Sequence, residues 1–131
     1  MGHFRALKIL SFWFPVALYS AIIFYVSSLP RLEAPVDLPH LDKGFHVLEY
    51  VPFGFLLARA WANTKKDLSP RILIGFVVLC SFLYGLSDEY HQSFVLGRFV
   101  EMGDLGADSL GGLLGAAAYL FLTKNTKSNK T

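Results

Sequence analysis

Residues 72–92 read ILIGFVVLCSFLYGLSDEYHQ, a nearly unbroken apolar run that ends in the polar sequence SDEYHQ. A helix of roughly 20 residues crosses the ~30 Å hydrocarbon core of a bilayer, and this run has that length. The stretch therefore predicts a transmembrane helix whose last turns carry ionisable side chains. Because such groups are costly near a bilayer, they are the first place to look for function.

Three further apolar stretches have a similar length, at about residues 9–29, 45–62 and 105–123. The chain of 131 residues is 53% apolar and only 17% charged, and its mean hydropathy is +0.44. This balance is typical of integral membrane proteins. We therefore expect an all-α integral membrane protein with one domain over residues 1–131. Its predicted architecture is a compact bundle of four transmembrane helices, with a short re-entrant or interfacial loop between the third and fourth.

The basic residues are distributed unevenly between the two ends of these expected helices. Positive residues concentrate at the cytoplasmic ends of membrane spans, which predicts a multi-pass protein with both termini in the cytoplasm. Scattered basic residues without interleaved aromatic ones argue against nucleic-acid binding and favour contact with anionic lipid. The basic side has Arg5, Lys8, Lys65, Lys66, Arg71, Lys124, Lys127 and Lys130, whereas the opposite side has Arg31, Lys43 and Arg98.

The segments between the expected helices also contain residues that indicate their structure. Residues 30–39 contain three prolines, which cannot continue a helix, so we expect an extended segment there. Residues 63–70 form a short polar turn, in which Ser69 is suited to cap the next helix and Pro70 to begin it. Residues 94–103 mix apolar and charged side chains with two glycines, which favours an interfacial segment.

A second polar stretch, residues 41–50, reads LDKGFHVLEY. Residues three, four and seven apart share one face of a helix, so spacing predicts which side chains face the same way. On the second expected helix, one face should carry Asp42, His46, Glu49 and Tyr50. On the third, one face should carry Ser81, Tyr84, Asp88 and either His91 or Gln92. On the fourth, Asp104 and Asp108 should share a face. All three groups fall at the same, extracytoplasmic end of the expected bundle, so they can meet.

We therefore predict a ligand-binding pocket at the outer leaflet. Lys43 or Arg98 should pair there with Asp88, Glu89 or Asp104, because pairing lowers the cost of charge near a bilayer. The predicted pocket residues are Asp42, Lys43, His46, Glu49, Tyr50, Asp88, Glu89, Gln92, Arg98, Asp104 and Asp108.

Four uses of this pocket remain open. It could be a polar network that only orders the helices, or it could bind a lipid headgroup without changing it. It could also hydrolyse a lipid-linked phosphate, with His46, Glu49 and Asp88 as candidate acid and base groups. Finally, Asp42, His46 and Glu49 could join Asp88 or Asp108 around a divalent metal. No HExxH motif or paired Cys/His spacing supports that use, so we assign no metal ligand, and the sequence leaves any cofactor unknown.

Small residues recur every four positions in the last apolar stretch, at Ala107, Gly111 and Gly115. Such a ridge lets another helix approach closely. Packing within the bundle is the simplest interpretation, and association with a partner helix or a second copy through Gly111 and Gly115 is the alternative.

At these residues the chain resembles the VanZ-like family of small bacterial membrane proteins. The resemblance runs from Asp42 to Gly115 in order and spacing. In the family a proline often precedes the Gly-Arg pair and an asparagine often replaces Asp108, whereas this chain has Leu96 and Asp108. The matching pieces are Asp42-Lys43-x-x-His46-x-x-Glu49-Tyr50, then Ser87-Asp88-Glu89-x-x-Gln92-x-Phe94-x-x-Gly97-Arg98, and Asp104-x-x-x-Asp108-x-x-Gly111-x-x-x-Gly115.

The resemblance implies a multi-helix protein of the bacterial cytoplasmic (inner) membrane with a role in the cell envelope. The family is named for a protein that lowers susceptibility to the glycopeptide antibiotic teicoplanin. A pocket that binds an anionic lipid or lipid-linked envelope precursor, and so affects teicoplanin susceptibility, is consistent with that context. The resemblance does not decide whether the chain is an enzyme.

Overall fold

The structure, a computed structural model, describes residues 2–30 and 41–128. Every regular element in these ranges is an α-helix: α1 (Gly2–Ser27), α2 (Leu41–Thr64), α3 (Pro70–Gln92) and α4 (Met102–Ser128). The prediction of four helices is thus confirmed, and each expected apolar stretch forms the body of one of them. The predicted extended linker lies almost wholly outside the described residues.

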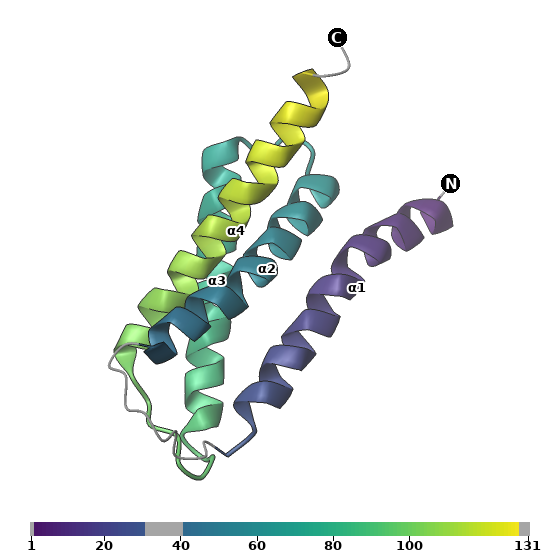
Figure 1. Ribbon diagram of the computed structural model, residues 1–131. Coiled ribbons are helices and arrows are strands. Elements are labelled where there is room, and N and C mark those ends of the chain that lie inside the picture. Colours follow the sequence, from purple (N-terminus) through teal and green to yellow (C-terminus); the bar gives the residue numbers. More distant parts are fainter. Residues whose placement is uncertain (1, 31–40, 129–131) are drawn as a thin grey trace.

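Successive helices run in opposite directions, so the α2–α3 turn lies at the end of the bundle where the described chain begins and ends (Figure 1). Helix α2 packs most extensively against α4 and also contacts α1 and α3. It is the helix most surrounded by its neighbours, and its polar residues therefore face other helices. Helix α1 lies along α2 on the outside of this group (Figure 1).

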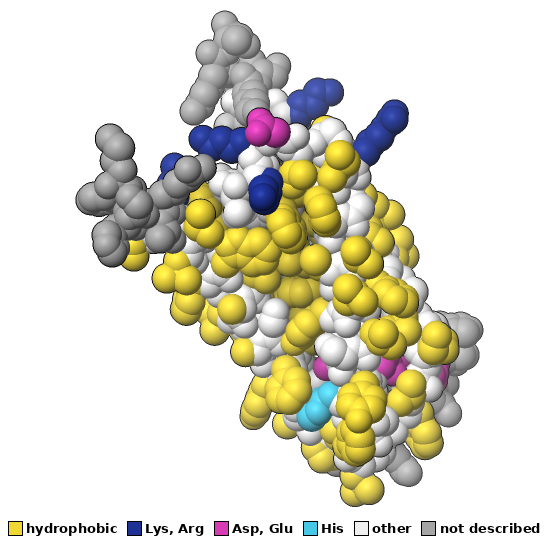
Figure 2. Space-filling model, turned by 180° about the vertical axis from the view of Figure 1, so that it is seen from behind, with side chains coloured by type: hydrophobic (Ala, Val, Ile, Leu, Met, Phe, Trp, Pro, Cys, Tyr) yellow, Lys and Arg dark blue, Asp and Glu magenta, His cyan; other side chains and the backbone are white. Residues whose placement is uncertain are grey.

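Three helices are long and apolar enough to cross a membrane, over Leu7–Ser27, Pro70–Gln92 and Met102–Thr126. Figure 2 shows apolar side chains along the length of one face, with Lys and Arg side chains gathered at one end. Helix α2 is not apolar enough to be among them, because it contains Asp42, Lys43, Glu49 and Arg59. A membrane protein follows from the three apolar helices, while a span formed by α2 stays a prediction.

Close backbone approach explains the small-residue ridge on α4. Gly111 faces α2, where an added Cβ would lie 2.6 Å from the carbonyl oxygen of Val47, and Gly115 also faces the α2 backbone. On α2, a Cβ at Gly54 would lie 2.6 Å from the Cα of Gly112. The ridge is therefore filled by the chain's own α2. A partner helix at Gly111 and Gly115 would have to displace it.

Hydrogen bonds attach α1 to its neighbours. The hydroxyl of Tyr84 donates to the carbonyl of Ser20 at 2.6 Å, and that of Tyr19 donates to the carbonyl of Glu49 at 3.0 Å. At the other end of α1, the indole of Trp13 donates to Thr64 Oγ1 at 2.9 Å. Such bonds matter in lipid, where burial of apolar surface between helices gains little.

The connections agree with their sequence signals. Ser69 caps α3 by accepting the N–H of Ile72 at 3.4 Å, and Pro70 begins the helix. Between α3 and α4 the chain turns at Gly97, whose φ of 77° is a conformation that favours glycine. The large apolar side chains of Phe94, Leu96 and Phe99 are exposed in this connection. Its insertion into the interface stays a prediction.

Candidate functional site

The start of α2, the end of α3 and the start of α4 bring ionisable residues together at the end of the bundle opposite the α2–α3 turn. We call six of them the polar cluster: Lys43, His46, Glu89, Glu101, Asp104 and Asp108. In Figure 2, acidic side chains at this end lie partly covered by apolar ones. All but Glu101 belong to the predicted pocket residues, and among them helical spacing had placed His46, Asp104 and Asp108 at one depth.

His46 lies between two carboxylates of α4. Its Nδ1 is 2.9 Å from Asp108 Oδ1, and its Nε2 is 3.7 Å from Asp104 Oδ2. Asp108 is only 1% exposed and Asp104 is also buried. Since Asp104 and Asp108 are one turn apart on α4, they present both carboxylates to the same imidazole. Asp104 also lies in the first turn of α4, where the helix dipole favours a negative charge.

Lys43 forms the outer side of the cluster. Its Nζ is 2.6 Å from Glu101 Oε2 and 3.4 Å from Asp104 Oδ1. The hydrogen bond to Glu101, followed by the charge of Asp104, raises the pKa of the Lys43 ammonium, so it stays charged at neutral pH. The side chains of Lys43 and Glu101 are 31% and 50% exposed. Exposed ion pairs of this kind stabilise a protein little and can exchange partners easily.

Glu89 is the most unusual member of the cluster, because one of its oxygens is buried without a partner. Its Oε2 accepts the backbone N–H of Glu101 at 3.2 Å, whereas its Oε1 has no hydrogen-bond partner among the described residues. The residue is 2% exposed. One ligand atom each from His46, Glu89 and Asp104 lies within 4.8 Å of the others, and the same holds for Asp42, Glu101 and Asp104. These groups could hold a metal.

Asp88 belongs to a separate network that ties α3 to α1. Its carboxylate accepts a hydrogen bond from Ser27 Oγ at 2.5 Å and another from Gln92 Nε2 at 2.8 Å. All three residues are buried. Of the two predicted neighbours on the Asp88 face, the structure therefore selects Gln92. His91 instead lies 2.9 Å from Ser28 Oγ through its Nε2.

Three predicted pocket residues lie near the polar cluster without an ion pair to it among the described contacts. Arg98 turns back to α1, where its guanidinium donates to the carbonyls of Leu29 at 3.4 Å and Val26 at 3.3 Å. Glu49 is half-buried, and Tyr50 is fully buried with its hydroxyl unpaired. The expected pairing of a basic residue with a carboxylate is thus made by Lys43.

Asp42 lies beside Lys43 at the start of α2. Its Oδ1 accepts the backbone N–H of Lys43 at 2.9 Å. The predicted pocket did not include Glu101 or Ser27, because Glu101 precedes α4 and Ser27 lies at the end of α1, outside the polar stretches. In the sequence, each of these two residues stands out only as a polar residue beside an apolar segment.

The balance of charge limits what the polar cluster attracts. Four carboxyl groups face one lysine and one histidine, so most of the cluster suits cations and hydrogen-bond donors, and an anionic group has to bind on the side of Lys43. A phosphate group would contact Lys43, the exposed cation of the cluster. His46, held by Asp108 through Nδ1, directs its other nitrogen toward Asp104, an arrangement suited to moving a proton.

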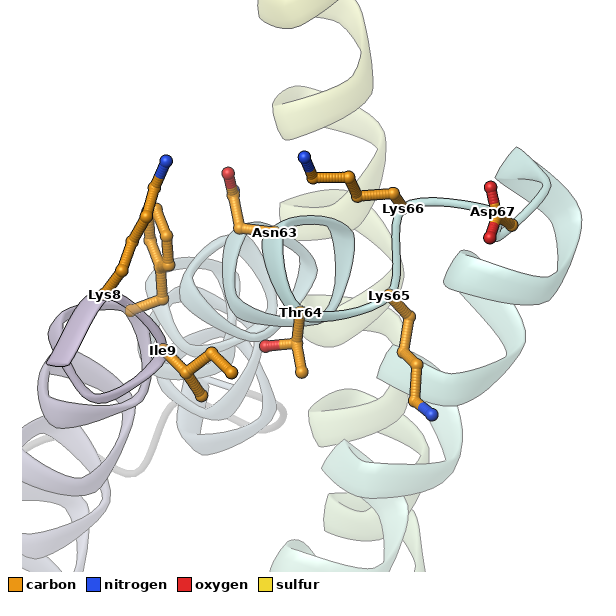
Figure 3. Close-up of a pocket in the computed structure, with 8 residues that line it drawn as sticks. Lys8, Ile9, Asn63, Thr64, Lys65, Lys66 and Asp67 are labelled. Carbon is orange, nitrogen blue, oxygen red and sulfur yellow. The ribbon is translucent and has the colours of Figure 1, made fainter. Parts of the chain in front are cut away.

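A pocket of about 820 Å³ lies at the opposite end of the bundle. Figure 3 shows Lys8 of α1 across from Asn63 and Thr64 at the end of α2, with Lys65 and Lys66 in the turn that follows. Its basic residues belong to the side that the charge distribution predicts to be cytoplasmic. This pocket is therefore a place where anionic lipid could lie, at the other end from the polar cluster.

Comparison with protein families matches residues 3–123 to the family model described as VanZ/LLP1. The match covers most of the chain, including the whole polar cluster. No curated protein matches the chain, and no solved structure does.

Proposed function

The chain belongs to the VanZ/LLP1 family, and from this premise we propose that its polar cluster binds the headgroup of an anionic lipid or lipid-linked envelope precursor. In this proposal the protein is a multi-pass component of the bacterial cytoplasmic membrane. All four helices span it, both termini are cytoplasmic, and the α3–α4 connection lies in the outer interface. Altered susceptibility to glycopeptides such as teicoplanin is the expected cellular consequence.

The observation that carries the proposal is the meeting of three helices' ionisable residues at one end of an apolar bundle. A headgroup lying at the membrane interface would reach the polar cluster from the side of Lys43. Because the ion pair between Lys43 and Glu101 is exposed, a phosphate can take the place of Glu101 at small cost. The carboxylates behind it would accept hydrogen bonds from hydroxyl or ammonium groups of the same headgroup.

The proposal predicts selective retention of anionic lipid. Native mass spectrometry of the purified protein should detect more bound phosphatidylglycerol or polyprenyl phosphate than phosphatidylcholine. Lys43→Gln should reduce that retention several-fold by removing the phosphate contact. Arg71→Gln, which removes an exposed basic residue at the other end of the bundle, should reduce it much less. Equal losses in both variants would show that only general charge attraction is involved.

A membrane-embedded hydrolase is the second candidate, and the contact of His46 with Asp108 favours it. A carboxylate on Nδ1 fixes the imidazole tautomer and leaves Nε2 free to accept or donate a proton. His46→Ala should then abolish release of phosphate from a lipid-linked phosphate while the protein keeps its helical circular dichroism. Failure of the unaltered protein to turn over a panel of polyprenyl and phospholipid phosphates would rule this function out.

A further inference from the structure

His46, Glu89 and Asp104 come from three different helices, yet each places a ligand atom within 4.8 Å of the other two. We propose that these three residues bind a divalent transition-metal ion of the Zn²⁺ or Mn²⁺ class. An imidazole nitrogen with two carboxylate oxygens suits such ions better than Mg²⁺ or Ca²⁺, which prefer oxygen ligands alone. The site is not the one considered from the sequence, because Glu89 and Asp104 replace Asp42 and Glu49.

The unpaired oxygen of Glu89 is the independent observation that points to a ligand. Glu89 is 2% exposed, and its Oε1 has no hydrogen-bond partner within the described chain. A buried polar atom without a partner is costly, and buried charges are normally paired or bound to a metal. A cation that Glu89 binds through this oxygen, together with His46 and Asp104, would satisfy it.

The surrounding contacts already orient the proposed ligands. Asp108 accepts from the Nδ1 side of His46 at 2.9 Å, which leaves the Nε2 lone pair available on the side of Asp104. Metal-binding histidines commonly show this carboxylate contact on the other ring nitrogen. Glu89 Oε2 is held by the backbone N–H of Glu101, and Asp104 Oδ1 is held by Lys43.

Distance and charge also fit the proposal. With metal–ligand bonds of about 2.0–2.1 Å in tetrahedral geometry, ligand atoms lie roughly 3.3–3.4 Å apart. His46 Nε2 and Asp104 Oδ2 are 3.7 Å apart, and no two of the three ligand atoms are more than 4.8 Å apart, so metal binding would draw the side chains closer together. Two carboxylates neutralise a divalent ion. Three protein ligands leave a position open for water or a phosphate oxygen, as in catalytic metal sites.

The test of metal binding is independent of headgroup binding, because metal binding is measured without lipid. The full chain, purified in detergent without a histidine tag, is stripped with a chelator and titrated with Zn²⁺ and then Mn²⁺. Calorimetry and elemental analysis after desalting should give about one ion per chain. Glu89→Gln, His46→Gln and Asp104→Asn should each weaken binding by tenfold or more, and Asp108→Asn should weaken it by about 10–100-fold.

Two control variants test whether the effect is specific to this site. His91→Gln removes a histidine that contacts Ser28, and Asp67→Asn removes an exposed carboxylate in the α2–α3 turn; neither should change the affinity. Unchanged helical circular dichroism of the Glu89→Gln variant separates ligand loss from misfolding. Absence of a stoichiometric ion in the unaltered protein, or equal binding by the ligand and control variants, overturns the proposal.

Discussion

Asp88 is a buried carboxylate whose contacts are structural. It joins the end of α3 to the end of α1 through Ser27 and also accepts from Gln92. We predict that Asp88→Ala lowers the free energy of unfolding by about 1–3 kcal/mol, because a buried amide donor loses its acceptor. Thermal or denaturant unfolding in detergent, followed by circular dichroism, would measure this.

Asp88→Asn is the matched control for that prediction. The amide keeps the shape of the carboxylate and one accepting oxygen, so it should be less destabilising than the alanine variant. An alanine variant as stable as the unaltered protein would mean that the Ser27–Asp88 link contributes nothing to the attachment of α1.

Residue positions in the site were predictable where a regular helix carries the side chain. Helical spacing places His46, Asp104 and Asp108 at one depth, and the structure brings them within hydrogen-bond or ion-pair distance. Helical spacing could not predict side-chain contacts where the backbone is not helical. The direction of Arg98 depends on the turn at Gly97, which has a positive φ, and the contact of Glu101 with Lys43 depends on how the loop enters α4.

The pairing of α2 with α4 is the element-scale feature that positions the site, because these helices supply Lys43, His46, Asp104 and Asp108. Hydropathy predicted the apolar helices well, since it needs only length and composition. It described α2 least well, because this helix is surrounded by neighbours and carries the polar residues that face them. Which helix faces which depends on side-chain size and could be inferred only partly, from the glycine ridge.

Gly111 and Gly106 on α4 provide a matched pair for testing this packing. A Cβ at Gly111 would lie 2.6 Å from the carbonyl oxygen of Val47, whereas a Cβ at Gly106 would meet nothing within 4 Å. We predict that Gly111→Ala destabilises the protein by about 1–3 kcal/mol through overpacking. Gly106→Ala should be neutral or stabilise it by about 0.5–1 kcal/mol, because alanine is the better helix former.

Unfolding of both glycine variants in detergent would decide whether α2 and α4 meet through this ridge. Equal tolerance of the two substitutions would contradict the close contact. If Gly111→Ala instead changed the oligomeric state without changing stability, the ridge would serve association with another chain rather than packing within this one.

At the scale of the whole molecule, the two ends of the bundle differ in charge. The polar cluster at one end is rich in carboxylates, while Lys65, Lys66 and Arg71 lie at or near the turn at the other end. The positive-inside tendency predicts that the basic end faces the cytoplasm and that the polar cluster lies on the extracytoplasmic side. Access of an envelope ligand to His46 depends on this orientation.

Cysteine labelling in intact cells tests the orientation directly. With Cys80 replaced by serine, single cysteines at residues 42 and 98 should react with a membrane-impermeant maleimide added outside, because both lie at the end that carries the polar cluster. A cysteine at residue 66, in the α2–α3 turn, should react only after the membrane is permeabilised. The opposite pattern would place the polar cluster in the cytoplasm, and an extracytoplasmic lipid-linked precursor could then no longer be its ligand.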